Sequence, residues 1–289
     1  MLTRIGVMDL KYRLIAFDMD GTLLDNNKKI PPRCLRALWS AAERGCLIVP
    51  ATGRMLSGLP EELRNGPICY HILINGALVF DSVENKILYE GNIAVSQAVE
   101  LCKWLDNLPV LYDCYIDNEG FMAGHMCDGA EPYFENSRNM FKYVMNTRTR
   151  VEVLADYMEK RGAPVQKMQI YFRPDQEELR RELLKKLPQL FPHFAATTSL
   201  PNNVEINSIQ AGKEKGLAAL CRVLGINTAD CIVFGDGSND RDIIAAAGLG
   251  VAMANAEEQV KAVADRIALS NAEEGVAVFI EELIASGEI

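Results

Sequence analysis

Short apolar segments alternate with amphipathic segments over residues 13–80. RLIAFDMDG at 13–21 and CLIVPATGR at 46–54 are apolar runs that end in polar residues, a pattern typical of buried strands. Between them, residues 31–45 begin with two prolines, place apolar residues at helical spacing and end in glycine, which indicates a helix. A short helix is expected at 57–63, and YHILINGALVF at 70–80 predicts a third strand with a turn at Asn75 and Gly76.

The same alternation returns in the last part of the chain. Helices are predicted at 212–225, 239–248, 257–264 and 275–286, and strands at 231–237, 249–255 and 266–270. Strands that alternate with helices in this way are typical of a parallel sheet covered by helices on both faces. The two blocks together therefore predict an α/β fold with a doubly wound parallel sheet.

The middle of the chain follows a different pattern. Two hairpins are expected there, one with its turn at 117–120 and one joined by 200–203, together with helices at 95–105 and 174–187 and a strand at 167–172. This mixed pattern interrupts the alternation and indicates an inserted α+β domain. We therefore expect a core formed by 1–82 and 197–289, and an inserted domain formed by 83–196.

Composition narrows the class of protein. The chain has 289 residues, of which 49% are hydrophobic, enough for a substantial core. A net charge of −9 argues against nucleic-acid binding, and the longest apolar stretch, about 14 residues at 243–256, is too short to cross a membrane. Eight cysteines without a CxxC pair are expected to be reduced thiols in the cytoplasm. The oligomeric state is not indicated.

Four aspartates mark the candidate site. Asp18 and Asp20 end the first strand, and Asp236 and Asp240 follow a later strand in GDGSND. Ligands of open α/β sheets bind at the carboxyl ends of the strands, so these acids are expected to converge. Each close pair would cost about 1 to 4 kcal/mol at 4 Å, a repulsion that a bound Mg²⁺ reverses. An EF-hand is excluded because Arg241 stands where its loop requires glycine.

Groups suited to a phosphate stand at other strand and helix ends. ATGR supplies the Thr52 hydroxyl and the N–H groups of Gly53 and Arg54, and either Lys213 or Lys215 could place an ammonium beside the anion. A carboxylate nucleophile, a second acid for the leaving oxygen and cationic partners for the phosphoryl group together indicate phosphate-ester hydrolysis. Asn75 is a further candidate because it ends a core strand.

These motifs, in this order, resemble a known family. DMDGTLLD, ATGR, the lysine before a helix and GDGSND resemble the four motifs of the haloacid dehalogenase superfamily, and the long insert resembles Cof-type phosphatases with a C2B cap. The resemblance covers nearly the whole chain. It implies a phosphatase that uses Mg²⁺ and an aspartyl-phosphate intermediate, with a cap domain that selects a sugar phosphate, a nucleotide or a cofactor phosphate.

The resemblance also assigns roles by position. Asp18 resembles the nucleophile and Asp20 the general acid/base, while Thr52 and Lys213 resemble the pair that holds the phosphate. The implied metal ligands are Asp18, Asp236 and the backbone carbonyl of Asp20, with Asp240 as a ligand or a supporting acid and Asn239 as a phosphate or supporting contact. Candidate substrate selectors in the insert are Asp113, Asp117, His125, Arg138, Lys142, Lys167 and Gln169.

Three other functions remain open at this point. Gly248, Gly250 and Ala254 weakly match a dinucleotide-binding fingerprint, without its strand–turn–helix order. A non-catalytic module that binds a phosphorylated ligand would not need Asp20. A phosphomutase on the same scaffold differs only in the acceptor of the phosphoryl group, so analysis of the products separates it from a phosphatase.

Overall fold

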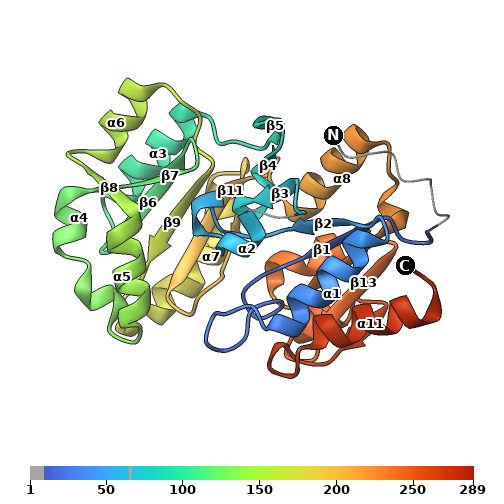
Figure 1. Ribbon diagram of the computed structural model, residues 1–289. Helices are drawn as coiled ribbons and strands as arrows, with labels where there is room; N and C mark the ends of the chain where they lie inside the picture. The colour runs from blue at the N-terminus through green and yellow to red at the C-terminus, as the bar shows by residue number, and fades with distance from the viewer. Residues whose placement is uncertain (1–9, 65–66) are drawn as a thin grey trace. The chain divides into compact units, whose positions relative to one another are not determined.

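The computed structural model describes residues 10–64 and 67–289, which divide into two compact units (Figure 1). The first, called the core unit here, comprises the chain up to Tyr89 together with Gly212–Ile289. The second, called the insert unit, is Glu90–Ala211. Within the described ranges, no helix is long and apolar enough to cross a membrane.

The core unit is built on a five-stranded parallel sheet with strand order β14-β13-β12-β1-β2. The strands are β1 (Leu14–Phe17), β2 (Leu47–Pro50), β12 (Cys231–Gly235), β13 (Leu249–Met253) and β14 (Arg266–Ala268). All four residues of β1 are buried, which explains its unbroken apolar run. Phe17 lies opposite Pro50 on one side and Phe234 on the other, so these strands end at the same edge.

Helices cover both faces of this sheet. They are α1 (Pro32–Glu43), α8 (Lys213–Leu224), α9 (Arg241–Ala246), α10 (Glu258–Lys261) and α11 (Gly275–Ser286). Helices α1 and α11 pack together on one side of the sheet, where Arg33 and Glu281 form an ion pair, and α8 packs beside α9 on the other (Figure 1). The predicted doubly wound α/β fold is confirmed.

The third predicted strand is instead a hairpin outside the parallel sheet. Strands β3 (Tyr70–Leu73), β4 (Leu78–Asp81) and β5 (Lys86–Glu90) form an antiparallel sheet, attached to the parallel sheet by a bridge between Ala51 and Ile72. The reversal occurs at residues 74–76, which all have positive φ. The helix predicted at 57–63 is divided into Leu56–Gly58 and α2 (Glu61–Arg64) on either side of Pro60, which has no N–H to continue the first turn.

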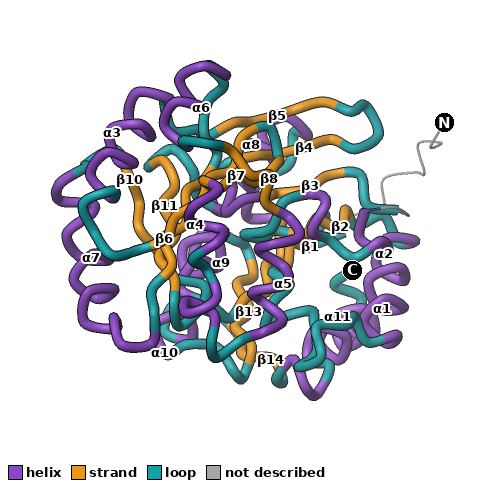
Figure 2. Tube along the Cα trace, turned by 90° about the vertical axis from the view of Figure 1, so that its left-hand side faces the viewer, coloured by secondary structure: helices purple, strands orange, loops and turns teal. Residues whose placement is uncertain are grey.

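The insert unit contains a six-stranded mixed sheet with strand order β10-β11-β9-β6-β7-β8. Its strands are β6 (Leu111–Ile116), β7 (Glu119–Ala123), β8 (Arg148–Val151), β9 (Lys167–Tyr171), β10 (Phe194–Thr197) and β11 (Asn203–Ser208). Its helices are α3 (Val95–Leu105), α4 (Gly124–Asp128), α5 (Arg138–Thr147), α6 (Leu154–Arg161) and α7 (Glu177–Leu190). Helices α3, α6 and α7 share one apolar core with the sheet, and Figure 2 distinguishes these helices and strands by colour.

The boundaries between the two compact units lie at 89/90 and 211/212, whereas the sequence pattern placed them at 82/83 and 196/197. Strand β11 was expected in the core but pairs with β9 of the insert unit, and β5 was expected in the insert but belongs to the hairpin sheet of the core unit. The local hydrophobic pattern identifies a strand but not the strand it pairs with. For this reason both observed boundaries differ from the predicted ones. Both expected hairpins, by contrast, are present, with Ile116 paired to Glu119 in the first and Thr197 paired to Glu205 in the second.

Candidate active site

Three carboxylates gather at the carboxyl edge of the parallel sheet. Asp18 follows β1, Asp236 follows β12, and Asp240 immediately precedes α9. One oxygen from each lies within 4.8 Å of the others, and Asp18 and Asp240 are buried. Because β1 and β12 are adjacent and in register, residues that follow them necessarily meet at this edge.

A buried lysine joins two of these acids. The Nζ atom of Lys213, at the start of α8, lies 2.6 Å from Asp18 Oδ1 and 2.5 Å from Asp240 Oδ1. A lysine in the first helical turn opposes the helix dipole, so these two carboxylates must compensate it. Lys215, the alternative candidate, is partly exposed and lies 3.9 Å from Glu214. Lys213 is therefore the lysine that reaches Asp18.

The electrostatics of the cluster favour an additional positive charge. Burial raises the pKa of Asp18, with Asp240 and Asp236 adding to the effect and Lys213 opposing it. Burial also raises the pKa of Asp236, to about 6, against a hydrogen bond from Thr22. Burial lowers the pKa of Lys213, but the two carboxylates outweigh it and the pKa is raised overall. The ammonium is thus retained, while the raised pKa values of Asp18 and Asp236 oppose their ionisation.

The GDGSND loop folds around Asp240. Its Oδ2 atom accepts the N–H groups of Asp236 and Gly237, each at 3.0 Å. A Cβ atom on Gly235 would lie 2.5 Å from Asp240 Cβ, closer than real atoms approach. Glycine is therefore required for the strand to end this close to the acid.

Two neighbours of Asp236 were not selected from the sequence. Thr22 Oγ1 donates to Asp236 Oδ1 at 2.6 Å. Gly21 has a φ of +88°, and a Cβ there would lie 2.3 Å from Asp236 Oδ2. Both residues stand within DMDGTLLD, so the motif contained the signal, but their partner lies more than two hundred positions away, at a separation of 214 for Thr22.

Asp20 lies outside the group of three acids. Arg54 binds its carboxylate in a bidentate manner, Nε to Oδ2 and Nη2 to Oδ1, both at 2.8 Å, and Lys28 Nζ lies 2.8 Å from Oδ1. Burial would raise the pKa of Asp20, but the hydrogen bonds and charges of Arg54 and Lys28 lower it overall. The expected convergence of four carboxylates is therefore corrected to three, because β1 ends at Phe17 and strand alternation does not extend to Asp20.

The phosphate-binding candidates form a second group of contacts. Thr52 is buried, and its Oγ1 accepts the backbone N–H of Arg54 at 3.2 Å, the N–H that was expected to face an anion. Asn239 Nδ2 donates to Asn75 Oδ1 at 3.1 Å, and a Cβ on Gly53 would lie 2.8 Å from that same oxygen. Asn75 thus connects the loops that carry Gly53 and Asn239.

The selector candidates of the insert unit occupy two kinds of position. Three are buried in a polar network, in which Asp113 binds Arg148 at 2.6 Å, Lys167 binds Glu205 at 3.1 Å, and Gln169 hydrogen-bonds two tyrosines. The others are exposed, and they are Asp117, His125, Arg138 and Lys142. Asp117 pairs with Arg161 at 2.6 Å.

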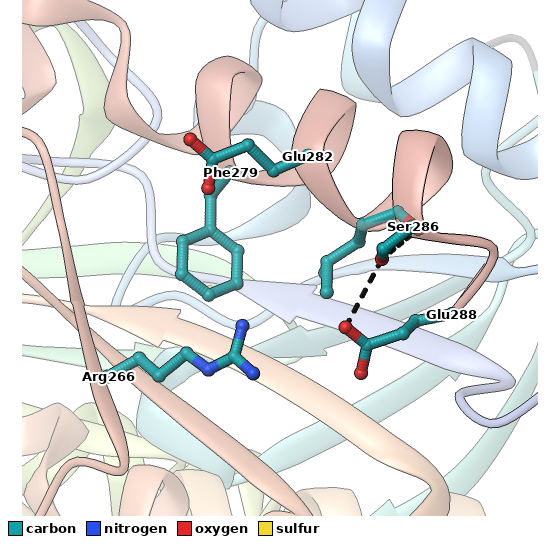
Figure 3. A pocket seen from close by; sticks show the side chains of 6 residues that line it. Arg266, Phe279, Glu282, Ser286 and Glu288 are labelled. Carbon is teal, nitrogen blue, oxygen red and sulfur yellow. Dashed lines mark hydrogen bonds between the residues drawn. The ribbon is translucent and has the colours of Figure 1, made fainter.

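A shallow pocket of about 140 Å³ lies elsewhere in the core unit (Figure 3). Arg266 and Phe279 line it together with Ser286 and Glu288 near the end of α11. Arg266 opens β14, so this pocket lies at the amino end of a strand, whereas the acids follow carboxyl ends. The chemistry expected of the chain therefore belongs to the acid cluster.

Comparisons with known proteins agree with this geometry. Residues 15–280 match the haloacid dehalogenase-like hydrolase family. The chain is 30% identical to an HMP-PP phosphatase of Serratia proteamaculans, over 86% of each protein. It is 28% identical to a 5-amino-6-(5-phospho-D-ribitylamino)uracil phosphatase of Bacillus subtilis, over 93% of this chain and 94% of that one.

A solved structure extends the likeness to the fold. A haloacid dehalogenase-like hydrolase from Bacteroides thetaiotaomicron matches with a TM-score of 0.78 at 27% identity, over 94% of this chain and 99% of that one. The parallel sheet, the acids at its carboxyl edge and these relatives lead to one conclusion: the chain belongs to the haloacid dehalogenase-like hydrolase family and is a phosphatase.

Proposed function

We propose that this phosphatase hydrolyses a small phosphorylated metabolite through a covalent aspartyl-phosphate on Asp18, with Mg²⁺ as its metal. The main support is the position of Asp18, whose Oδ1 lies 2.6 Å from a fully buried lysine inside a cluster of three acids. A nucleophilic carboxylate and a phosphate repel each other, and Lys213 supplies positive charge where they would meet.

The donor set fits a hard divalent cation. Asp18 and Asp236 offer carboxylate oxygens, the backbone carbonyl of Asp20 offers a third oxygen, and Asp240 lies beside them as a ligand or a supporting acid. Mg²⁺ prefers oxygen ligands of this kind, and because burial and, less strongly, the charge of Asp240 raise the pKa of Asp236, a cation beside it would favour its charged form. When bound, the metal would offset the repulsion between carboxylate and phosphate.

The residues of the chain then account for both chemical steps. Asp18 attacks phosphorus, the bond to the leaving oxygen breaks, and Asp20 gives that oxygen a proton. Water next attacks the phosphoryl group on Asp18, and a proton of that water passes to Asp20. The bond between Asp18 and phosphorus breaks, so inorganic phosphate is released and the Asp18 carboxylate is restored. Groups proposed to hold the phosphate oxygens are Thr52, Gly53, Arg54, Lys213 and Asn239.

The substrate class is proposed to be a sugar phosphate, a nucleotide or a cofactor phosphate. One relative is named for a phosphorylated ribitylamino-uracil, which is a small metabolite of this kind. We assign the choice among such substrates to the insert unit, because its sheet differs in topology from the core sheet and carries its own buried charged side chains.

A panel of phosphorylated metabolites tests this function. Release of inorganic phosphate is measured with and without Mg²⁺, for the wild type and for Asp18→Asn. We expect Mg²⁺-dependent release by the wild type and none by the folded variant. Hydrolysis retained by Asp18→Asn would exclude Asp18 as the nucleophile, and an isomerised phosphate ester without free phosphate would identify a phosphomutase instead.

A further inference from the structure

A tight turn follows the first motif of the core unit. Asp25 N–H donates to Lys29 O, and Lys28 N–H donates to Asp25 O, both at 2.9 Å. The Asp25 carboxylate accepts the N–H groups of Asn27 and Lys29, at 2.8 and 2.9 Å. The segment at 25–29 is therefore a defined turn whose geometry is set by its own hydrogen bonds.

This turn is also attached to the body of the core unit. The buried side chain of Asn271 donates from Nδ2 to Leu24 O at 2.8 Å, immediately before the turn. Leu24 in addition forms a β-bridge with Asp20. The turn thus starts from a fixed point beside the candidate acid.

Lys28 has an unfavourable backbone conformation in this turn. Its φ is +61°, in the left-handed region where glycine or asparagine is preferred and where other residues cost roughly 1–2 kcal/mol. The two residues before it, Asn26 and Asn27, are asparagines, yet the left-handed position of the turn carries a lysine. A residue other than glycine or asparagine at such a position points to a use for its side chain.

That side chain contacts Asp20. Lys28 Nζ lies 2.8 Å from Asp20 Oδ1, the oxygen that also accepts Arg54 Nη2. The lysine side chain is 63% exposed, and ion pairs of such exposure contribute little to stability. Stability of the fold therefore does not explain why a strained position carries this lysine.

We propose that Lys28 is a positioning residue for Asp20, holding its carboxylate together with Arg54 during turnover. This inference rests on the proposed role of Asp20 in proton transfer. Arg54 fixes the plane of the carboxylate through two hydrogen bonds, and Lys28 adds a third contact from the turn at 25–29. Loss of the lysine leaves the acid with one anchoring side chain and a wider range of orientations.

A double-mutant cycle tests the proposal. Wild type, Lys28→Asn, Asp20→Asn and the double variant are compared on an alkyl phosphate, whose leaving oxygen needs the proton that Asp20 is proposed to supply. Asparagine suits the left-handed backbone, so Lys28→Asn should fold at least as well as the wild type. Lys28→Arg tests rescue, and Lys29→Met is the matched control because Lys29 is an exposed lysine of the same turn.

Lys28→Asn should lower kcat about 10-fold with little change in KM, because a misplaced catalytic group slows chemistry more than binding. In the Asp20→Asn background the same change should alter kcat less than about 2-fold, since its partner is already removed. Lys28→Arg should recover most of the loss, and Lys29→Met should match the wild type. Equal effects of Lys28→Asn in both backgrounds, or no effect in either, would overturn the proposal.

Thermal unfolding of the same four proteins separates this proposal from the function on which it rests. Non-additive shifts of Tm show the contact between Lys28 and Asp20 whether or not the substrate chemistry is correct. A wild type without Asp18-dependent turnover overturns the proposed function, and the unfolding cycle alone then decides whether Lys28 holds Asp20. The coupling should be small because the lysine side chain is largely exposed, and shifts that are additive within the error of replicate scans contradict the contact.

Discussion

Single residues in this site differ sharply in environment over short distances in the chain. Asp18 points to a buried lysine and two other acids, whereas Asp20, two positions later, is bound by an arginine and a second lysine. The pKa of Asp18 is raised, mainly by burial, and that of Asp20 is lowered because its cationic partners outweigh burial. The two neighbouring aspartates therefore lie in opposite electrostatic environments.

Asp20→Asn should slow catalysis far more than it weakens metal binding. The proposed metal contact of Asp20 is its backbone oxygen, which the substitution leaves in place, whereas proton transfer needs the carboxyl group. We expect kcat on an alkyl phosphate to fall roughly 10²–10⁴-fold. Titration with Mg²⁺, followed by thermal unfolding, should show nearly unchanged affinity. An equally large loss of affinity would contradict this division of roles.

Asp236→Asn should stabilise the protein in the absence of metal. Burial raises the pKa of Asp236 to about 6, so the folded protein keeps this proton more tightly than the unfolded chain. Stability of the wild type should therefore fall as pH rises from about 4 to 6 and stay reduced above it, by at most about 3 kcal/mol. The variant lacks this titration, so its Tm should exceed that of the wild type at pH 7.

Thermal unfolding in a chelator between pH 4 and 8 measures this difference. The difference should shrink toward pH 4, where Asp236 is protonated in the folded protein and roughly half protonated in the unfolded chain. Addition of Mg²⁺ should raise the Tm of the wild type and not that of the variant. A variant that is less stable than the wild type at pH 7 without metal would show that Asp236 is not strained by its surroundings.

Among the elements, α8 is placed by close contact at its start. The turn at Gly76, between β3 and β4, lies directly against the carbonyl of Gly212, the residue before α8. A Cβ atom on Gly76 would lie 2.0 Å from that oxygen, and both groups are backbone. The hairpin that replaced the expected third strand therefore sets where Lys213 begins its helix.

Gly76→Ala and Gly225→Ala make a matched pair of substitutions: Gly76 contacts the residue before α8, and Gly225 follows its last residue. Both glycines have positive φ, +80° and +65°, so each alanine incurs a similar backbone strain of about 1 kcal/mol. Gly225 has open space around it, whereas Gly76 would collide with backbone. Gly76→Ala should cost at least about 3 kcal/mol more in the free energy of unfolding. Chemical denaturation compares them, and similar losses would mean that the contact at Gly212 relaxes freely.

At the scale of the whole molecule, each unit has its own buried polar centre. In the insert unit the ion pair of Arg148 and Asp113 is almost fully buried, and two tyrosine hydroxyls complete it. In the core unit the centre is Lys213 with its two acids. We expect the loss of a charged side chain from one centre to lower mainly the stability of the unit that contains that centre.

Arg148→Met should destabilise the insert unit by about 3–5 kcal/mol, because it leaves Asp113 buried without its cation. Arg150→Met is the control, since Arg150 pairs with Asp128 at the surface and its loss should cost less than about 1 kcal/mol. Calorimetry should show a lowered transition only for Arg148→Met. The metal-induced rise in Tm of the core unit should persist, and its disappearance would contradict independent centres.

Much of the architecture follows from local pattern. Helices at 95–105 and 275–286 were predicted with the bounds that the structure has, because amphipathic and apolar spacing is a local signal. The convergence of Asp18 and Asp236 was predictable as well, since parallel strands end at one edge. The turn at Asn75 and Gly76 was predicted too, but the pairing of the two halves of 70–80 as an antiparallel hairpin outside the parallel sheet was not, because an apolar run does not show its partners.

By itself, the sequence determined which residue types follow each strand, and therefore the family and the acid cluster, whereas the structure decided that Lys213 and not Lys215 reaches Asp18. Only the tertiary structure decided where each side chain points: Asp20 toward Arg54 and Lys28 instead of the other acids, and β11 into the sheet of the insert unit. The physical reason is range. Periodicity and motifs record neighbours along the chain, whereas ion pairs and strand partners depend on atoms brought together only when the chain folds.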